Sequence, residues 1–504
     1  MRASLSDGRV RPVVVVGAGP AGLTAAVTLA QHGIEVLLVE RRAAGSELPR
    51  ATVLGVRNME MFRSWGLADR VLAGGVDVEM SMRAIPTVAR AAEGIRIDVG
   101  YPSPAQSAMV SPMSPAAVPQ DHLESVLLEH LATLPTATVV RGFEALGVRH
   151  TSDHAVLTLK DVRSGQKFDV AAEYVIAADG AKSRIRSSLG IDHTGLDGLI
   201  EGVMTEFHAP LWELMGEHRH GVYSITDPEG AGILVPAGPD DRWLFGTDLP
   251  RDVVDDTDAA RELLRQRIER AAGVPGIPVR IDRFGWFSSA AQIADTFSSG
   301  RVFLAGDAAH RVTPRGGTGL NTAIAGGRDL GWKLAWVLLG WAPPEFLSTY
   351  EEERRPVAAH NVARSADPEG GSREAMSELQ VDLGGRIAHA WIDAESSSGS
   401  PSGETRLSTI DLVGPGLTLF MGPDVQTTRG GPTRPGRPPV TTKPLPQHAA
   451  RALGLRPSGA VLLRPDEVPI ASWGVAAPSQ TDVEQAVAAF IPQQTATLTA
   501  RRTA

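Results

Sequence analysis

A glycine-rich segment near the start of the chain has the residues and the spacing needed to bind a dinucleotide. It reads Gly17, Ala18, Gly19, Pro20, Ala21 and Gly22, and it directly follows the apolar run at residues 13–16. The first glycine permits a tight turn, the second lets the backbone approach a pyrophosphate, and the third lets the next helix pack closely. The N-terminal N–H groups of the helix predicted over residues 21–31 would face the phosphates.

An acidic residue ends the next predicted strand, which covers residues 35–39. This residue, Glu40, can accept hydrogen bonds from both hydroxyls of a ribose, and its charge disfavours the 2′-phosphate of NADP at this site. Glu40 and the adjacent Arg41 are therefore candidate cofactor contacts. The alternative is that the three glycines serve packing alone. That alternative does not explain why the strand, the glycine spacing, the helix and the acid all fit nucleotide binding.

Two further strand-to-turn junctions follow much later in the chain. Residues 173–178 lead into Asp179 and Gly180, and residues 301–305 lead into Gly306 and Asp307. Ligands bind at such junctions in open α/β sheets, and an aspartate there can accept hydrogen bonds from a ribityl chain. Together with the first glycine motif, these junctions predict FAD rather than NAD as the bound nucleotide.

A second glycine-rich loop precedes a helix predicted over residues 320–339. Its candidate flavin contacts are Pro314, Gly316, Gly317, Gly319, Leu320 and Asn321. The N-terminus of this helix would aim N–H groups and a positive dipole at one point, where they can stabilise the negative charge of reduced flavin. The nearby His310 is interpreted as a packed or backbone-bonded histidine.

With these motifs, the sequence resembles the single-component (class A) flavoprotein aromatic hydroxylases, especially the three-domain phenol and polyketide hydroxylases. The matching stretches are residues 17–22, 49–51, 179–186, 300–321, 329–334 and 462–466, together with Gln120 and Glu124. The resemblance implies that Arg50 and Gln120 contact the flavin. The sequence departs from the family at Gln292, where an arginine is usual, and in the glycine-rich pattern of residues 325–328.

The expected fold class is α/β, with a Rossmann-type FAD-binding domain, an inserted antiparallel β-sheet substrate domain and a small thioredoxin-like C-terminal domain. Residues 1–188 and 288–375 are assigned to the FAD-binding domain, with a contribution of about residues 76–100 to the substrate domain left open. Residues 189–287 contain short alternating runs separated by turn clusters and form the substrate domain. Residues 376–504 form the thioredoxin-like domain that the resemblance implies.

Five aromatic residues of the inserted domain are candidates for lining an aromatic substrate pocket, although core packing is the favoured role for any one of them: Tyr223, Trp243, Phe245, Trp286 and Phe287. No catalytic residue is identified. A base could draw a proton from a phenolic substrate, and His208, His218, His220 and Tyr223 fall in the appropriate stretch. Residues 101–119 are expected to form a loop or an edge strand near the pocket.

The resemblance implies tightly but non-covalently bound FAD, and NAD(P)H as a transient co-substrate, with NADPH slightly favoured over NADH. In the implied reaction NAD(P)H reduces the flavin, O₂ adds at C4a, and the hydroperoxide passes its distal oxygen to an electron-rich phenolic or polyketide ring. Two alternatives stay open. The flavin could instead support Baeyer–Villiger oxidation or epoxidation, or the protein could be an idle flavoprotein that shields an intermediate, a reading that Gln292 keeps open.

The composition limits the remaining function classes. The chain has 504 residues, no cysteine and a formal net charge of −9. It therefore has no disulfide, thiolate metal site or dithiol relay, and we expect no metal. The negative charge and the lack of a basic run argue against nucleic-acid binding. No apolar run is long enough to span a membrane, so we expect a cytoplasmic monomer or homodimer that binds a small aromatic molecule.

Overall fold

The computed structural model describes residues 5, 8–43, 45, 51–251, 254, 257–393, 406–425 and 436–491. The chain divides into two compact units. The first comprises Met1–Gly331 and Glu351–Gly384, and the second comprises Trp332–Tyr350 and Gly385–Ala504. Among the described residues, no helix combines the length and apolar character that crossing a membrane requires.

A parallel sheet forms the centre of the first unit. Its strands run in the order β16-β17-β10-β1-β2-β7, with β17 at Val302–Leu304, β10 at Lys167–Ala177, β1 at Val10–Val16, β2 at Val36–Glu40 and β7 at Ala137–Arg141. The four pairs from β17 to β7 are parallel. The strands β16 (Ser298–Ser299), β8 (Phe143–His150) and β9 (Ala155–Asp161) add antiparallel pairs to the same sheet. The predicted mixed α/β fold with a parallel sheet is confirmed.

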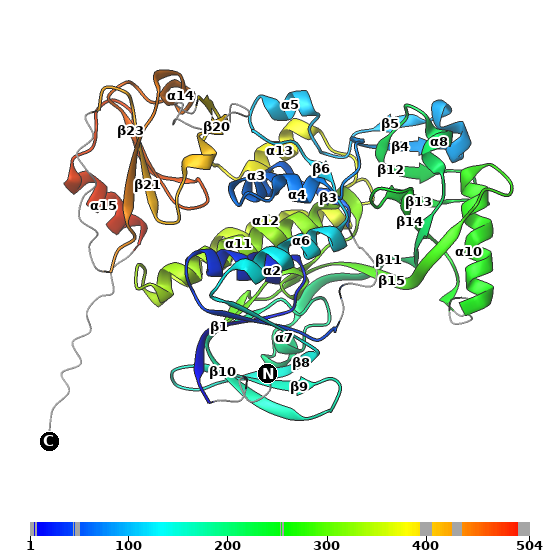
Figure 1. Cartoon of the computed structure of the whole chain (residues 1–504), viewed down its shortest axis with the longest axis horizontal. Coiled ribbons are helices and arrows are strands. Elements are labelled where there is room, and N and C mark those ends of the chain that lie inside the picture. The colour runs from blue at the N-terminus through cyan, green and yellow to red at the C-terminus, as the bar shows by residue number, and fades with distance from the viewer. Residues whose placement is uncertain are drawn as a thin grey trace. The chain divides into compact units, whose positions relative to one another are not determined.

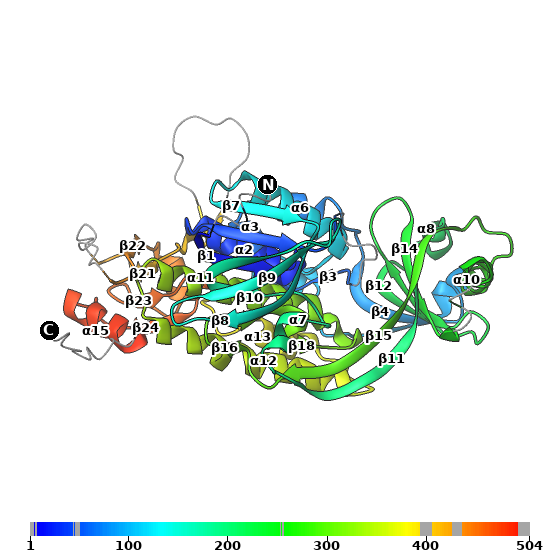
Figure 2. The ribbon, with the colours of Figure 1, turned by 90° about the horizontal axis from the view of Figure 1, so that it is seen from below.

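Three helices pack beside this sheet (Figures 1 and 2). They are α2 (Pro20–Gln31), α6 (Gln120–Thr133) and α11 (Thr318–Leu338). The helices α2 and α11 approach so closely that a Cβ on Gly327 would overlap the carbonyl oxygen of Ala21. This contact explains the glycine-rich pattern of residues 325–328, because a larger residue at position 327 would separate the two helices.

A second sheet of the first unit has the strand order β18-β15-β11-β14-β13-β12-β4-β5. The strands are β4 (Glu79–Ile85), β5 (Ile95–Ile97), β11 (His193–His208), β12 (His220–Ile225), β13 (Gly232–Pro236), β14 (Arg242–Thr247), β15 (Arg280–Ala294) and β18 (His310–Arg311). One pair, β4 with β12, is parallel, which the prediction of an antiparallel sheet did not include. The chain reaches β12 from β4 only after passing through the first sheet, so this pair is not a hairpin and its direction is not fixed by a turn.

One face of the second sheet is buried under short and long helices. These are η1 (Val88–Glu93), α8 (Leu211–Met215) and α10 (Thr257–Ala272). The core between them contains Phe207, Tyr223, Trp243 and Phe245, which are each 0% exposed. Because side chains alternate along a strand, the residues between these positions lie on the opposite face.

The second unit contains its own small sheet, with the strand order β22-β21-β23-β24. The strands are β21 (Leu417–Met421), β22 (Val440–Pro444), β23 (Ala460–Leu463) and β24 (Pro469–Trp473), and the flanking helices are α14 (Gln447–Ala452) and α15 (Gln480–Phe490). The pair β21 and β22 is parallel and the other pairs are antiparallel. Its core packs Trp332, Trp336 and Phe346 against β21 and β23.

Candidate functional site

The glycine motif forms the turn between β1 and α2. Gly17 has a φ of +105° and Gly22 packs against the same turn, and a Cβ on either residue would overlap a backbone carbonyl oxygen. Gly19 differs, because its φ is −79° and a Cβ there would meet no heavy atom of the described residues within 4 Å. The protein's own packing thus requires the first and third glycines, whereas the second faces open space where a pyrophosphate can approach the backbone.

Glu40 ends β2 beside this turn. Its carboxylate accepts hydrogen bonds from the N–H groups of Ala18 and Arg42, each at 2.8 Å. These contacts fix the carboxylate, and each oxygen retains further lone pairs for the hydroxyls of a ribose. Arg41, the next residue, is exposed.

Gln120 is the first residue of α6, and its side chain is oriented by the following turn of the same helix. Its Nε2 donates to Oε1 of Glu124 at 2.7 Å. Burial raises the pKa of the Glu124 carboxyl. With Nε2 committed to Glu124, the amide oxygen of Gln120 is the atom that can accept from a ligand hydroxyl.

The loops after β10 and β17 lie side by side because the two strands pair. Arg186 joins the loops, since its Nη1 donates to the carbonyl oxygens of Ala181 at 3.3 Å and Ala308 at 3.4 Å. The Asp179 carboxylate accepts from Ser183 Oγ at 2.5 Å and from the N–H of Ile185 at 3.2 Å. It therefore stabilises the start of α7 (Arg184–Ser188), whereas Asp307 is exposed at its strand end.

The glycine loop before α11 contains two consecutive left-handed residues, Gly316 with a φ of +76° and Gly317 with a φ of +62°. Because α11 starts at Thr318, the N–H groups of residues 318–320 have no acceptor within the helix. This turn includes Gly319 and Leu320, and it is the part of the loop best suited to hold an electron-rich edge of a ligand.

The side chain of Asn321 is occupied by the protein itself. Its Oδ1 accepts from the N–H of Gly55 at 2.7 Å, and its Nδ2 lies 3.2 Å from the carbonyl oxygens of Val53 and Gly317. Asn321 therefore supports the glycine loop through its side chain. The predicted contact Arg50 lies outside the described residues.

His310 is 5% exposed in β18. Burial lowers its pKa to about 4, so the imidazole is neutral near pH 7 and is a poor proton donor. Next to it, Arg311 donates from Nη1 to Oε1 of Gln292 at 2.8 Å. A guanidinium thus stands beside position 292, although the arginine usual in the family is absent there.

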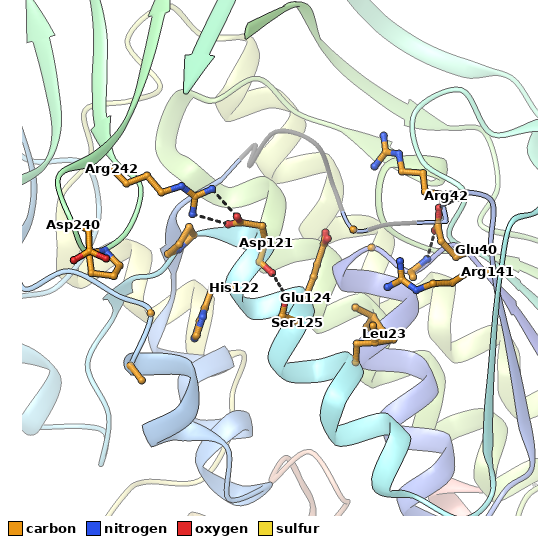
Figure 3. Close-up of a pocket in the computed structure, with 18 of the residues that line it drawn as sticks. Leu23, Glu40, Arg42, Asp121, His122, Glu124, Ser125, Arg141, Asp240 and Arg242 are labelled. Carbon is orange, nitrogen blue, oxygen red and sulfur yellow. Dashed lines mark hydrogen bonds and ion pairs between the residues drawn. The ribbon is translucent and has the colours of Figure 1, made fainter. Parts of the chain in front are cut away.

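A cavity of about 590 Å³ opens beside the glycine motif, which is within the usual size range of ligand pockets. Figure 3 shows Glu40 and Arg42 at one end, Glu124 in the middle, and Asp121 with Arg242 at the other end. Arg242 pairs with Asp121 and with the buried Glu206, each at 2.6 Å. This ion-pair chain joins α6 to the second sheet, and sequence reasoning missed it because its members are far apart in the chain and carry no motif.

Four of the five predicted pocket aromatics, all but Phe287, lie on the covered face of the second sheet. Trp243 pairs in register with Phe207. Phe245 pairs with Thr205 on one side and with Leu234 on the other. Leu234 in turn pairs with Tyr223. Trp286 packs against a neighbouring core that contains Val203 and Leu264. The structure therefore places these rings in packing positions and does not bring them to the cavity. Phe287 lies on the opposite face, next to Gly202.

The candidate bases are also held by the protein. Tyr223 donates to the carbonyl oxygen of His218 at 2.8 Å and accepts from the N–H of His220 at 2.7 Å, and burial raises its pKa to about 12. His220 is buried beside Ser81, and desolvation lowers its pKa. His208 alone among these candidates lines the cavity, and its Nε2 lies 3.1 Å from Asp282.

Comparison with known proteins places the chain in a family. Residues 11–365 match the family described as "FAD binding domain". A putative polyketide hydroxylase of Streptomyces halstedii is 36% identical over 70% of this chain and 64% of its own length. Aklavinone 12-hydroxylase DnrF of Streptomyces peucetius is 32% identical over 85% of this chain and 93% of its own length.

A solved structure shows the same relationship. The crystal structure of the flavin-dependent monooxygenase PieE in complex with FAD and substrate superimposes with a TM-score of 0.82 at 25% identity, covering 96% of this chain and 99% of that one. The chain therefore belongs to the FAD-binding-domain family of flavoprotein hydroxylases. The predicted class A family and the predicted cofactor, FAD, are both confirmed.

The open position of Gly19 generates a test. We predict that Gly19→Ala leaves the unfolding midpoint of the apoprotein unchanged, because the new methyl meets no protein atom. The same methyl should raise the Kd for FAD at least about tenfold, a loss of ~1.4 kcal/mol, because it stands where the pyrophosphate must approach. Isothermal titration with FAD measures the Kd.

Gly33→Ala is the matched control. Gly33 follows the same helix with a φ of +77° and open space around it, so alanine there costs about 1 kcal/mol of stability and leaves FAD affinity unchanged. Wild-type FAD affinity in Gly19→Ala would contradict the assignment of this turn to the pyrophosphate.

Proposed function

We propose that this chain is an FAD-dependent monooxygenase that uses NAD(P)H and O₂ to hydroxylate a phenolic, polyketide-type aromatic compound. One observation carries the proposal: the three motif-bearing loops converge at the carboxyl ends of the neighbouring strands β1, β10 and β17. The names of the relatives, a polyketide hydroxylase and an aklavinone hydroxylase, support the substrate class.

The residues that would hold FAD follow from the site. The turn at residues 17–22 would hold the pyrophosphate, Glu40 the ribose, Gln120 and Asp307 the ribityl chain, and the first turn of α11 the flavin ring. When bound, FAD supplies electron transfer from NAD(P)H and the activation of O₂. The protein supplies position, dipoles and exclusion of water.

We place the substrate on the face of the second sheet opposite the one that packs under α8 and α10. This face carries Met204 with Gly246 and Ile233 beside it in register, followed by Gly202 opposite Phe287. His208 and Arg242 lie on the same face and line the cavity. The glycines leave a low apolar surface beside Phe287, against which a flat polycyclic ring can stack.

We also propose the domain assignment made from the sequence, with residues 1–188 and 288–375 as the FAD-binding domain, 189–287 as the substrate domain and 376–504 as a thioredoxin-like domain. The membership of β4 and β5 in the second sheet supports a contribution of residues 76–100 to the substrate domain. A small sheet flanked by α14 and α15 supports the thioredoxin-like assignment. The chain has no cysteine, so this domain has no thiol chemistry, and we propose a structural or dimer-interface role for it.

The reaction is tested by product analysis. The purified yellow protein is mixed with NADPH or NADH, in air, with and without a panel of polycyclic phenols. We predict that a phenol accelerates NAD(P)H oxidation, with little H₂O₂, and that mass spectrometry finds one added oxygen on an intact ring. A ring-expanded product would contradict hydroxylation, and a flavin that no nicotinamide reduces would contradict any monooxygenase.

The substrate surface is tested by Gly246→Val. A Cβ at this position would lie 3.3 Å from the flexible end of Met204 and 3.9 Å from the carbonyl oxygen of Ile233, and it would project from the face proposed to hold the substrate. We predict that KM for the accepted phenol rises at least about tenfold, ~1.4 kcal/mol of binding, with FAD affinity unchanged. Steady-state kinetics and FAD titration measure the two quantities.

Thr205→Val provides the control on the covered face of the same sheet. Thr205 is 0% exposed, and its buried hydroxyl has no hydrogen-bond partner. Its removal should therefore leave KM unchanged without loss of stability. An unchanged KM in Gly246→Val would contradict the placement of the substrate on the face that carries Gly246.

A further inference from the structure

The glycine loop before α11 rests on two side chains from distant parts of the chain. A Cβ on Gly316 would lie 2.7 Å from Cζ of Arg364, and a Cβ on Gly317 would lie 3.1 Å from the hydroxyl of Tyr101. Both glycines are left-handed, so the loop follows a path that only glycine adopts readily. Tyr101 and Arg364 fill the space beneath this path.

Tyr101 also bonds directly to the loop. Its hydroxyl donates to the carbonyl oxygen of Gly317 at 3.0 Å and accepts from Nδ2 of Asn321 at 3.2 Å. Asn321 Nδ2 also reaches the Gly317 carbonyl, at 3.2 Å. The Gly317 carbonyl is therefore drawn into the protein by two donors.

This contact fixes the direction of the next N–H group. In a trans peptide the carbonyl of Gly317 and the N–H of Thr318 point in opposite directions. With the carbonyl turned inward to Tyr101, the Thr318 N–H points away from the protein interior. It is also the first N–H of α11, which has no acceptor within the helix and carries the positive end of the dipole.

Tyr101 is itself held in place. The guanidinium of Arg364, 5% exposed, donates to the carbonyl oxygens of Val99 at 3.1 Å and Gly370 at 2.9 Å and to Glu378 at 2.9 Å. These bonds anchor the backbone two residues before Tyr101. Residues 101–119, expected to form a loop or an edge strand, thus begin with Tyr101, which supports the glycine loop. The segment continues into the helix α5 (Pro104–Ala108).

We propose that Tyr101 is a positioning residue, which orients the Gly317–Thr318 peptide so that its N–H stabilises the negative charge of reduced flavin. The inference rests on the proposed function only in placing the flavin ring at the first turn of α11. A fixed N–H aimed at developing charge stabilises the charged form more than the neutral one. Tyr101 therefore affects the affinity for reduced FAD more than the affinity for oxidised FAD.

The test compares Tyr101→Phe with wild-type holoenzyme. Phenylalanine keeps the ring under Gly317 and removes the hydroxyl. The Kd for oxidised FAD should change less than about threefold, whereas the Kd for reduced FAD should rise about tenfold. That ratio corresponds to a reduction potential of bound FAD about 30 mV more negative, as a two-electron couple requires. Titration against a reference dye measures the potential without any substrate.

Tyr174→Phe is the matched control, because Tyr174 is a tyrosine of β10, 5% exposed, that packs on Phe303 away from the loop. It should leave the potential unchanged. Equal weakening of both redox states in Tyr101→Phe, or no change in either, would overturn the proposal. The ratio of the Kd for reduced FAD to the Kd for oxidised FAD stays measurable if the variant weakens FAD binding overall. If the Tyr101→Phe result contradicts this proposal, the proposed hydroxylation by the wild type still stands. If the wild type forms no hydroxylated product, that result counts against the proposed function and not against the role of Tyr101.

Discussion

Parallel pairing of β1, β10 and β17 is the constraint on which the site depends. Parallel strands end at the same edge of a sheet, so the turns at Gly17, Asp179 and Gly306 meet although long stretches of chain separate them. The strands are buried apolar runs such as Val13–Val16, and the burial that stabilises the sheet also fixes the turns. A shift in the register of one strand would move one of the three loops out of the site.

The sequence was sufficient where local chemistry determines the structure. At Gly17 and Gly22 a Cβ would overlap a backbone carbonyl oxygen, and the acid at the end of β2 bonds to the same turn. The helix after Pro314 was also predicted within two residues, because glycines before an apolar helix leave few alternatives. These features depend on neighbours in the chain, so they can be read from it directly.

The sequence left open which aromatic residues pack in the core and which line a pocket, because that depends on which face of a strand is covered. Tyr223, Trp243 and Phe245 are aromatic residues of the correct domain, but the register places all three under α8 and α10. No local signal distinguishes the two faces, since both contain apolar residues. The roles of Arg242, Tyr101 and Arg364 were missed for a similar reason, because each acts through partners more than a hundred residues away or through backbone carbonyls. Asn321 was predicted as a flavin contact, but its side chain supports the glycine loop instead.

The central claim is that one FAD molecule contacts all three loops together. Hydrogen–deuterium exchange, measured by mass spectrometry with and without saturating FAD, tests it most directly. FAD should slow exchange in peptides that cover residues 17–22, 179–181 and 306–321, and should leave the sheet of the second unit unchanged. Protection confined to the first glycine motif would contradict the account, because a nucleotide held there alone would not need the other two strand ends.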